Sequence, residues 1–247
     1  MKNYQANARN ILILMLKELK DAFTSPVAYI VISFFTIVVG IAFAKDIFVT
    51  SQADMRSVFN TASLVLVIVV PAITMRSFAE ERQSGTYEIL STLPLSSLQI
   101  LLAKFFANLF LCLVIILATL PIPIILNVIG QPNNGLIVAG YLGLFILSAS
   151  YVALGQFISI NSTSQVAAFL LTVTLIAILY VIGMDAFLQL LPQGMRSFFN
   201  ALSLKSHFDG IAKGVIDTRD ILYYFSILLL MFYFTFKSIL RIKKKGL

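Results

Sequence analysis

The chain has 247 residues, of which 59% are hydrophobic and only 12% are charged, and its mean hydropathy is +0.95. Soluble globular domains carry about 25% charged residues, so these values exclude an ordinary soluble fold. The net charge of +7 comes from Lys and Arg residues that lie between and beside apolar stretches. We therefore expect them to contact lipid head groups and to set the orientation in a membrane, and we expect no nucleic-acid partner.

The first predicted element is an amphipathic helix over residues 8–24. Its apolar side chains recur at helical spacing: Leu12, Met15, Leu16, Leu19 and Phe23. Charged residues occupy the opposite face, and Thr24-Ser25-Pro26 interrupts the pattern. A helix of this kind is expected to lie along the inner membrane interface as an elbow before the first span.

Six uncharged stretches are long enough to cross a bilayer of about 30 Å as helices. They lie near residues 27–44, 59–75, 105–126, 136–158, 166–184 and 221–237, the last of which is uncharged up to residue 236 and is extended by Lys237, whose stem can reach the interface. The A-x-A pattern at 42–44 also fits a secretory signal, but the apolar run before it exceeds the roughly 7–15 residues of a signal core. We therefore predict one all-α domain over residues 1–247, a polytopic membrane protein with six transmembrane helices, the third of them kinked at Pro121 and Pro123.

Six spans place both termini on one side of the membrane. With the termini inside, the inner side carries about twice as many Lys and Arg residues as the outer side. The positive-inside rule therefore predicts an inner (cytoplasmic) membrane protein with cytoplasmic termini. Residues 76–104 are then cytoplasmic, and residues 186–219 are outside.

The cytoplasmic segment contains signals for a helix between two turns. The second span is expected to continue to about Gln83, and Gly85 permits a chain reversal. Thr86 suits a helix N-cap, and Pro94 ends the short helix that follows it. Residues 96–99 match a capping box that opens the next helix. The segment is either a solvated connector or a shaped docking surface, and the two helix caps favour the second interpretation.

The outer segment, residues 186–219, is more apolar than a plain loop. Met195, Phe198, Phe199 and Leu202 follow helical spacing after Pro192. We expect one or two short helices that dip into the outer leaflet.

Several kinds of chemistry have no sequence support. The chain has no phosphate-binding G-x-x-x-x-G-K-[ST] motif, one histidine (His207) and one cysteine (Cys112), so we expect no catalytic or metal site. No acidic residue lies inside a predicted span, whereas ion-driven transporters use such residues for coupling. Energy is therefore expected to come from a partner.

The cytoplasmic segment resembles the first cytoplasmic turn of ABC-2 type transporter permeases. The residues that carry this resemblance are Phe78, Glu81, Arg82, Gly85, Thr86, Glu88, Leu90, Pro94, Ser96 and Lys104. A second resemblance covers residues 206–209, 214–217 and 219–224. The opening residues look most like the subgroup of gliding-motility and copper-enzyme-maturation permeases.

The resemblance implies that two six-span subunits form a dimer, either two copies of this chain or this chain and a paralogue. Each subunit would bind a soluble P-loop ATPase, and that ATPase would hold ATP and Mg²⁺. This chain itself would need no cofactor. The implied coupling residues, within segment 76–97, are Glu80, Glu81, Arg82, Gly85, Thr86, Tyr87, Glu88, Leu90 and Pro94. The implied outer-gate residues, in re-entrant helices, are Phe198, Phe199, His207 and Asp209.

Three functions remain open at this point. The first is an ATP-driven export permease. The second is a non-transporting membrane subunit that transmits ATPase strokes to a larger envelope complex or anchors it. The third is an intramembrane enzyme, which the lack of charged groups and histidine pairs within the spans disfavours.

Overall fold

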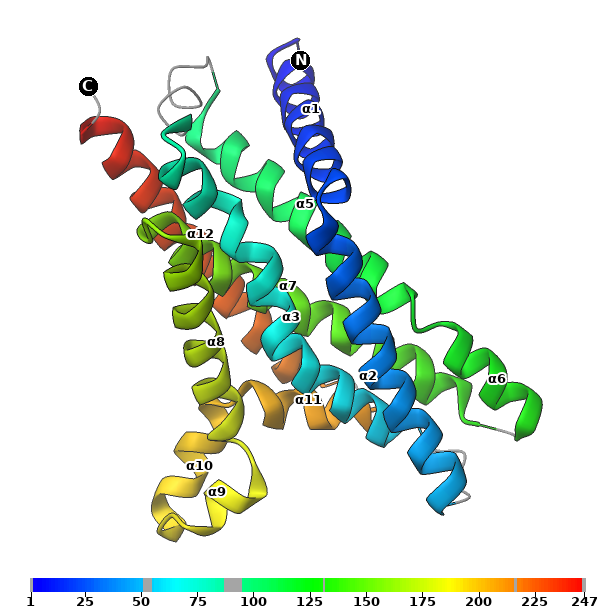
Figure 1. Ribbon diagram of the computed structural model, residues 1–247. Helices are drawn as coiled ribbons and strands as arrows, with labels where there is room; N and C mark the ends of the chain where they lie inside the picture. Colours follow the sequence, from blue (N-terminus) through cyan, green and yellow to red (C-terminus); the bar gives the residue numbers. More distant parts are fainter. Residues whose placement is uncertain (1, 51–54, 87–94, 131, 216, 246–247) are drawn as a thin grey trace.

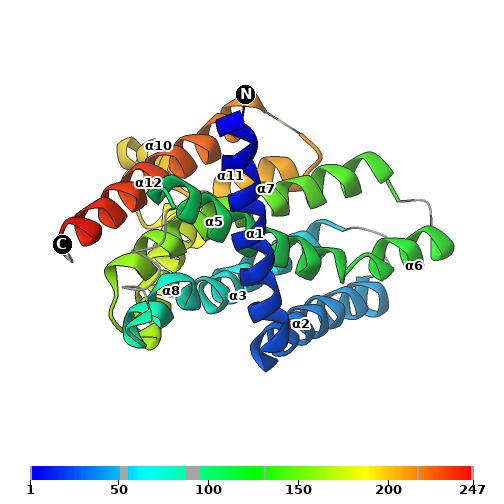
Figure 2. The ribbon, with the colours of Figure 1, turned by 90° about the horizontal axis from the view of Figure 1, so that it is seen from above.

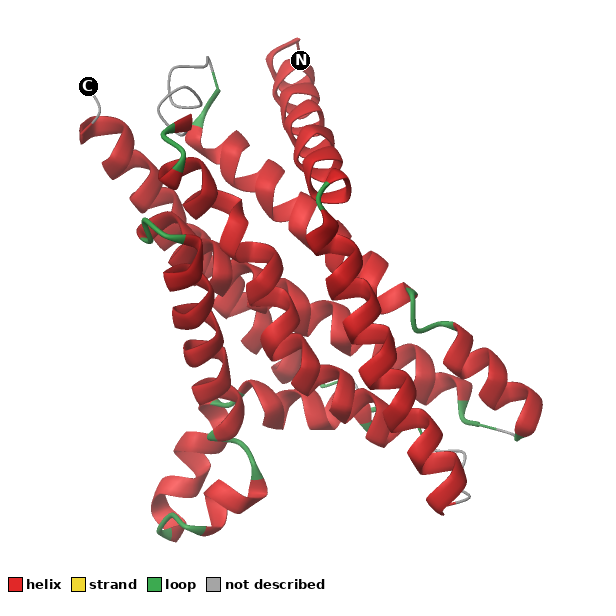
Figure 3. Cartoon of the chain, in the orientation of Figure 1, coloured by secondary structure: helices red, strands yellow, loops and turns green. Residues whose placement is uncertain are grey.

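A computed structural model describes residues 2–50, 55–86, 95–130, 132–215 and 217–245. Every regular element in these ranges is a helix (Figure 3). The long helices are α1 (Lys2–Thr24), α2 (Pro26–Thr50), α3 (Arg56–Gln83), α5 (Ser97–Leu117), α7 (Asn134–Asn161), α8 (Gln165–Val181) and α12 (Thr218–Lys245). The short helices are α6 (Pro121–Ile129), α9 (Asp185–Gln189), α10 (Gln193–Leu202) and α11 (Leu204–Ala212). The predicted all-α fold is confirmed.

The apolar helices lie where the sequence places the spans. Among the described residues, five helical stretches are long and apolar enough to cross a membrane: 26–48, 56–83, 97–129, 134–161 and 218–244. Helix α8 covers the predicted fifth span but has only 17 residues, about 26 Å at 1.5 Å per residue. The chain is therefore a multi-pass membrane protein. The third span is interrupted at residues 118–120, and Pro121 opens α6, which confirms the predicted break.

Helices α3 and α7 form the centre of the bundle. In the most apolar stretch of each, 67% of the residues are buried, against 22% in α2 and 17% in α12. The core along this seam includes Leu66 and Val70 of α3 with Leu147 and Tyr151 of α7. Helices α2 and α12 therefore lie at the periphery, where their exposed apolar faces can meet lipid or another subunit.

Both chain ends lie at the same end of the bundle (Figure 1), beside the ends of α3 and α5 that flank residues 84–96. Helices α6, α9, α10 and α11 lie toward the opposite end. Seen from above, α1 crosses the bundle end and runs over α5, against which it packs (Figure 2). Placement of α1 in a membrane interface remains a prediction.

The buried side of α1 differs from the predicted apolar face. Leu14, which the predicted face omits, is only 7% exposed and packs with Phe78 and Ile100. Leu12 and Leu16 are 56% and 55% exposed. The difference arises because the same helix presents apolar residues both to α5 and away from the bundle.

Candidate functional site

Helix α3 continues well beyond the predicted second span. It ends at Gln83, as predicted, and Ser84 closes its last turn by donating from its hydroxyl to the Glu80 carbonyl at 2.9 Å. Gly85 follows with φ +74°, a left-handed conformation that residues with a Cβ rarely adopt. Gly85 therefore has the turn conformation that the predicted reversal requires, and the chain that follows Thr86 lies outside the described residues.

The next helix begins with the predicted capping box. The Gln99 N–H donates to Ser96 Oγ at 3.2 Å, and the Ser96 N–H donates to Gln99 Oε1 at 2.8 Å. From the far end of the chain, Lys243 of α12 donates to the Leu95 carbonyl at 3.0 Å. Ser84 on one side and residues 95–99 on the other therefore attach the chain on both sides of residues 87–94 to the bundle. The predicted coupling residues Tyr87, Glu88, Leu90 and Pro94 lie outside the described residues.

Lys104 of α5 lies in a buried triad of charges. Its side chain is 1% exposed, and Nζ lies 2.9 Å from Glu18 of α1 and 2.9 Å from Glu81 of α3. The ring of Phe78 covers the ammonium group at 5.2 Å from its centroid. These contacts, which we call the Lys104 triad, join three helices that are far apart in sequence.

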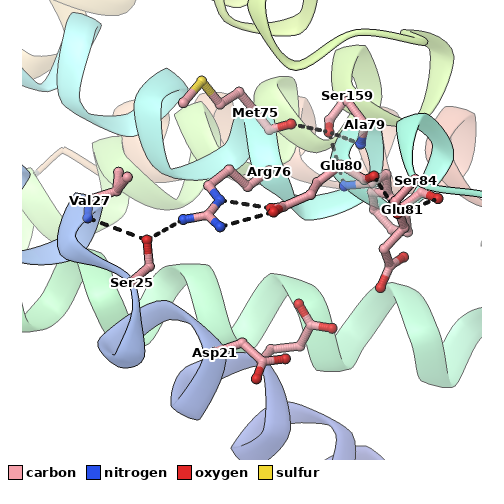
Figure 4. A network of polar contacts seen from close by, with 12 residues as sticks. Asp21, Ser25, Val27, Met75, Arg76, Ala79, Glu80, Glu81, Ser84 and Ser159 are labelled. Atoms are coloured by element: carbon pink, nitrogen blue, oxygen red, sulfur yellow. Dashed lines mark hydrogen bonds and ion pairs between the residues drawn. The ribbon is translucent and has the colours of Figure 1, made fainter. Parts of the chain in front are cut away.

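Arg76 of α3 reaches the junction between α1 and α2. Its guanidinium donates twice to Glu80, from Nε at 2.7 Å and from Nη2 at 3.0 Å, and also donates to Ser25 Oγ. Ser25 Oγ in turn accepts from the Val27 N–H, at the first turn of α2 (Figure 4). Arg76 therefore ties the end of α3 to the point where the chain turns from α1 into α2.

Arg82 faces the opposite direction, toward the turn between α7 and α8. Its Nη1 donates to the Ile160 carbonyl at 2.7 Å and to the Ser162 carbonyl at 3.4 Å. One turn of α3 earlier, Ser159 Oγ accepts from the N–H groups of Phe78 and Ala79 (Figure 4). The end of α3 is therefore held by the end of α7.

Residues 76–82 thus connect α3 to several of its neighbours at this end of the bundle. Arg76 reaches α1 and α2, Glu81 reaches α1 and α5 through Lys104, and Arg82 reaches α7. Of these contacts the Lys104 triad is buried, whereas the side chains of Arg76 and Glu80 are 31% and 40% exposed and Arg82 bonds to backbone carbonyls. We call residues 76–82 the α3 hub.

Sequence reasoning identified only part of the hub. Glu80, Glu81 and Arg82 were predicted as coupling residues, whereas Arg76 and Glu18 were not. Lys104 was identified only as one of the residues that carry the family resemblance. The available signal was Lys104 itself, a lysine that lies two turns inside a helix whose later residues are uncharged. Its partners could not be read from the sequence.

The remaining predicted coupling residues, Gly85 and Thr86, lie at the exposed turn beyond the hub. Thr86 Oγ1 lies 2.8 Å from Ser84 Oγ and donates to the Glu81 carbonyl at 3.4 Å. These contacts close the end of α3. The role of Thr86 as an N-cap concerns residues outside the described ranges and stays a prediction.

At the opposite end of the bundle, α11 carries two of the predicted outer-gate residues. His207 Nδ1 lies 2.6 Å from Asp220 of α12, and the His207 ring stacks on Tyr223 at 4.0 Å between centroids. Asp209 forms an ion pair with Lys205, one turn earlier in α11. His207 therefore connects α11 to the start of the last span.

The other two predicted outer-gate residues lie on α10. Phe198 is 67% exposed, and Phe199 packs edge-on against Phe187 of α9 at 6.0 Å. Three short helices, α9, α10 and α11, occupy this segment, where one or two were predicted. Their position on the outer side and their insertion into the outer leaflet as re-entrant elements remain predictions.

One of two comparisons with known proteins identifies a family for this chain. A family model described as "ABC-2 family transporter protein" matches residues 49–237, more than three quarters of the chain. The match begins near the end of α2 and includes the α3 hub and the short outer helices. A comparison with curated proteins found no significant match.

Proposed function

The chain belongs to the ABC-2 family of transporter proteins, and from this premise we propose that it is the permease subunit of an ATP-driven exporter. Members of this family are membrane transport subunits and are not themselves catalytic. In our proposal a separate soluble P-loop ATPase binds ATP and Mg²⁺ and drives substrate export. This chain supplies the membrane pathway and the surface on which the ATPase acts.

The observation that carries the coupling proposal is the α3 hub. Gly85 and Thr86 lie at the exposed turn directly after α3, and the hub connects the same helix to α1, α2, α5 and α7. An ATPase that binds the segment after Gln83 would therefore move α3 together with its neighbours. A simple connector between two spans does not need a buried lysine that is shared by two carboxylates from other helices.

We also propose that two permease chains form a dimer, either of identical copies or with a paralogue. The peripheral helices α2 and α12 support this proposal, because their exposed apolar residues include Ile37, Ile41, Leu229 and Leu230. Lipid covers whatever part of these faces the partner chain leaves free.

The orientation follows from the positive-inside rule, and we expect it to hold in the cytoplasmic membrane. In a Cys112→Ala background, a cysteine at position 83 should react only after the membrane is permeabilised. A cysteine at position 213 should react in intact cells. Labelling of position 83 from outside would contradict cytoplasmic placement of the hub.

The ATPase proposal predicts a copurifying partner. The purified chain alone should hydrolyse no ATP, whereas a mildly solubilised complex should contain a soluble subunit whose sequence has a P-loop. Gly85→Val should abolish this copurification, because a β-branched residue is strained at φ +74° and the turn would change.

The matched control is Gly40→Val on α2, where no heavy atom lies within 4 Å of an added Cβ. ATP hydrolysis by the verified single chain, or normal copurification of Gly85→Val, would count against the proposal. A transport assay in sealed vesicles distinguishes an exporter from a membrane subunit that only transmits the conformational changes of the ATPase, because only the exporter moves a substrate across the membrane.

A further inference from the structure

A cavity of about 400 Å³ lies beside the α3 hub, between α1, α2, α3 and α5. Its volume falls within the range of roughly 300–1,000 Å³ that is typical of small-molecule sites. The wall formed by α3 extends from Ala72 to Ser84, about 18 Å at 1.5 Å per residue. The cavity is therefore long enough for an extended ligand.

The chemistry of the cavity wall changes along its length. Near the end of α3 the wall contains the Lys104 triad. Further along, Ser77 and Asn108 line it and hydrogen-bond to each other at 3.3 Å. Beyond them the wall is apolar and includes Val31 and Leu111. A charged end and an apolar end suit an amphiphile, with its head group at the triad and its tail between α2, α3 and α5.

The charges of the wall favour a cationic head group. The acidic lining residues are Glu18, Asp21, Glu80 and Glu81, and the basic ones are Lys17, Arg76 and Lys104. Figure 4 shows Asp21 of α1 opposite Arg76 and Glu80 of α3. Arg76 is already paired with Glu80, and Lys104 is shared by two carboxylates. The lining therefore carries one more negative than positive group.

Among the acidic residues of the wall, Glu81 is the one with a buried carboxylate oxygen that is not hydrogen-bonded in the described part of the chain. Its Oε1 accepts from Lys104, whereas its Oε2 receives no hydrogen bond from any residue within the described ranges. Because Oε2 has almost no accessible surface, the carboxylate must turn toward the cavity to meet a ligand. A buried carboxylate that is only half satisfied is unfavourable, and a nearby N–H donor with positive charge would relieve it. A primary ammonium group offers three such donors.

We propose that this cavity binds an amphiphile that has a primary ammonium head group and a hydrocarbon tail. The ammonium group hydrogen-bonds to Glu81 at the Lys104 triad, and the tail lies along Ala72, Val31 and Leu111. The amphiphile is either an aminophospholipid of the adjoining leaflet or a soluble cationic amphiphile. The binding site does not depend on ATP coupling, because occupancy is measured without nucleotide or ATPase.

The test uses the full chain in nanodiscs of pure phosphatidylcholine. A photoactivatable hexadecylamine should label the protein saturably, and the labelled peptides should include residues 72–84 and 104–111. A hexadecyl sulfate with the same photoactivatable group should not compete. Equal labelling by the amine and the sulfate, or labelling elsewhere, would overturn the proposal.

Two variants locate the site. Glu81→Gln should weaken the binding of the amine by roughly tenfold, because the charged acceptor is lost, while Lys104 keeps Glu18 as its partner. Ala72→Phe retains every charge and should abolish labelling by filling the apolar end. The control, Ala167→Phe on the exposed face of α8, should bind normally. Unchanged labelling of a folded Ala72→Phe protein would overturn the proposal.

The source of the ligand follows from competition. If phosphatidylethanolamine added to the nanodiscs displaces the amine, the occupant is a membrane aminophospholipid. If it does not, while a soluble alkylamine does, the occupant is a cationic amphiphile from outside the bilayer. Failure of both to compete would show that labelling is nonspecific and would contradict the proposed site.

Discussion

Lys104→Met should destabilise the folded protein by about 3–5 kcal/mol, the range observed when one partner of a buried ion pair is removed. Methionine keeps the length of the aliphatic side chain, so the expected loss does not come from a cavity. It comes from two carboxylates, on Glu18 and Glu81, that lose their shared counter-ion. Both of these side chains are at most one fifth exposed, so solvent screens them only in part.

Thermal unfolding in detergent measures this effect, with Lys20→Met on the exposed face of α1 as the matched control. A triple variant that combines Lys104→Met with Glu18→Gln and Glu81→Gln should recover most of the loss, because it leaves no unpaired charge. If Lys104→Met unfolds at the same temperature as the control, the triad does not stabilise the protein.

Gly155→Ala should destabilise the seam between α3 and α7 by about 1–3 kcal/mol, the usual range for overpacking. A Cβ at position 155 would lie 2.1 Å from Thr74 Oγ1 and 2.7 Å from Thr74 Cβ. Thr74 cannot rotate away without losing the hydrogen bond from its hydroxyl to the Val70 carbonyl at 3.0 Å. The helices must therefore separate, and Ser159, one turn further along α7, would lose its contacts to α3.

The matched control is Gly40→Ala on α2, where an added Cβ meets no neighbour. It should be neutral or stabilising, since alanine favours a helix over glycine by up to about 1 kcal/mol. Adding Thr74→Ala to Gly155→Ala should recover only part of the loss, because the Cβ of the alanine at position 74 would still lie 2.7 Å from the added Cβ. Equal unfolding temperatures for Gly155→Ala and Gly40→Ala would show that the close approach of the two helices is absent.

Local signals in the sequence predicted the elements of this fold well. The capping box at residues 96–99, the left-handed turn at Gly85 and the interruption before Pro121 each depend on a few neighbouring residues. Such features are determined by backbone geometry and short-range hydrogen bonds. The same holds for the apolar spans, which only need sufficient length without charge.

The contacts of the α3 hub could not be predicted in this way. Lys104 and Glu18 are 86 residues apart, and Arg76 and Ser25 are 51 residues apart. Their pairing depends on how α1, α3 and α5 pack, which a single sequence does not reveal. The buried position of Leu14 on α1 depends on the same packing.

The structure also changes how two predicted coupling residues should be tested. Glu81 and Arg82 were expected to present charges to the ATPase, but both side chains bond within the permease. Replacing both by alanine would therefore disturb the bundle as well as any docking surface. Arg82 is the better probe, because its partners are backbone carbonyls and its removal leaves no buried charge unpaired.

The most direct test of coupling through the α3 hub is the ATP hydrolysis rate of the complex relative to the free ATPase subunit. Arg82→Ala should leave copurification of the ATPase intact, because the docking segment after Gln83 is unaltered. The change in hydrolysis rate that the permease causes should shrink by roughly tenfold, within the usual range of coupling energies. Lys20→Ala, exposed at the same end of the bundle, should retain the full change. If Arg82→Ala retains it as well, the hub does not transmit the action of the ATPase.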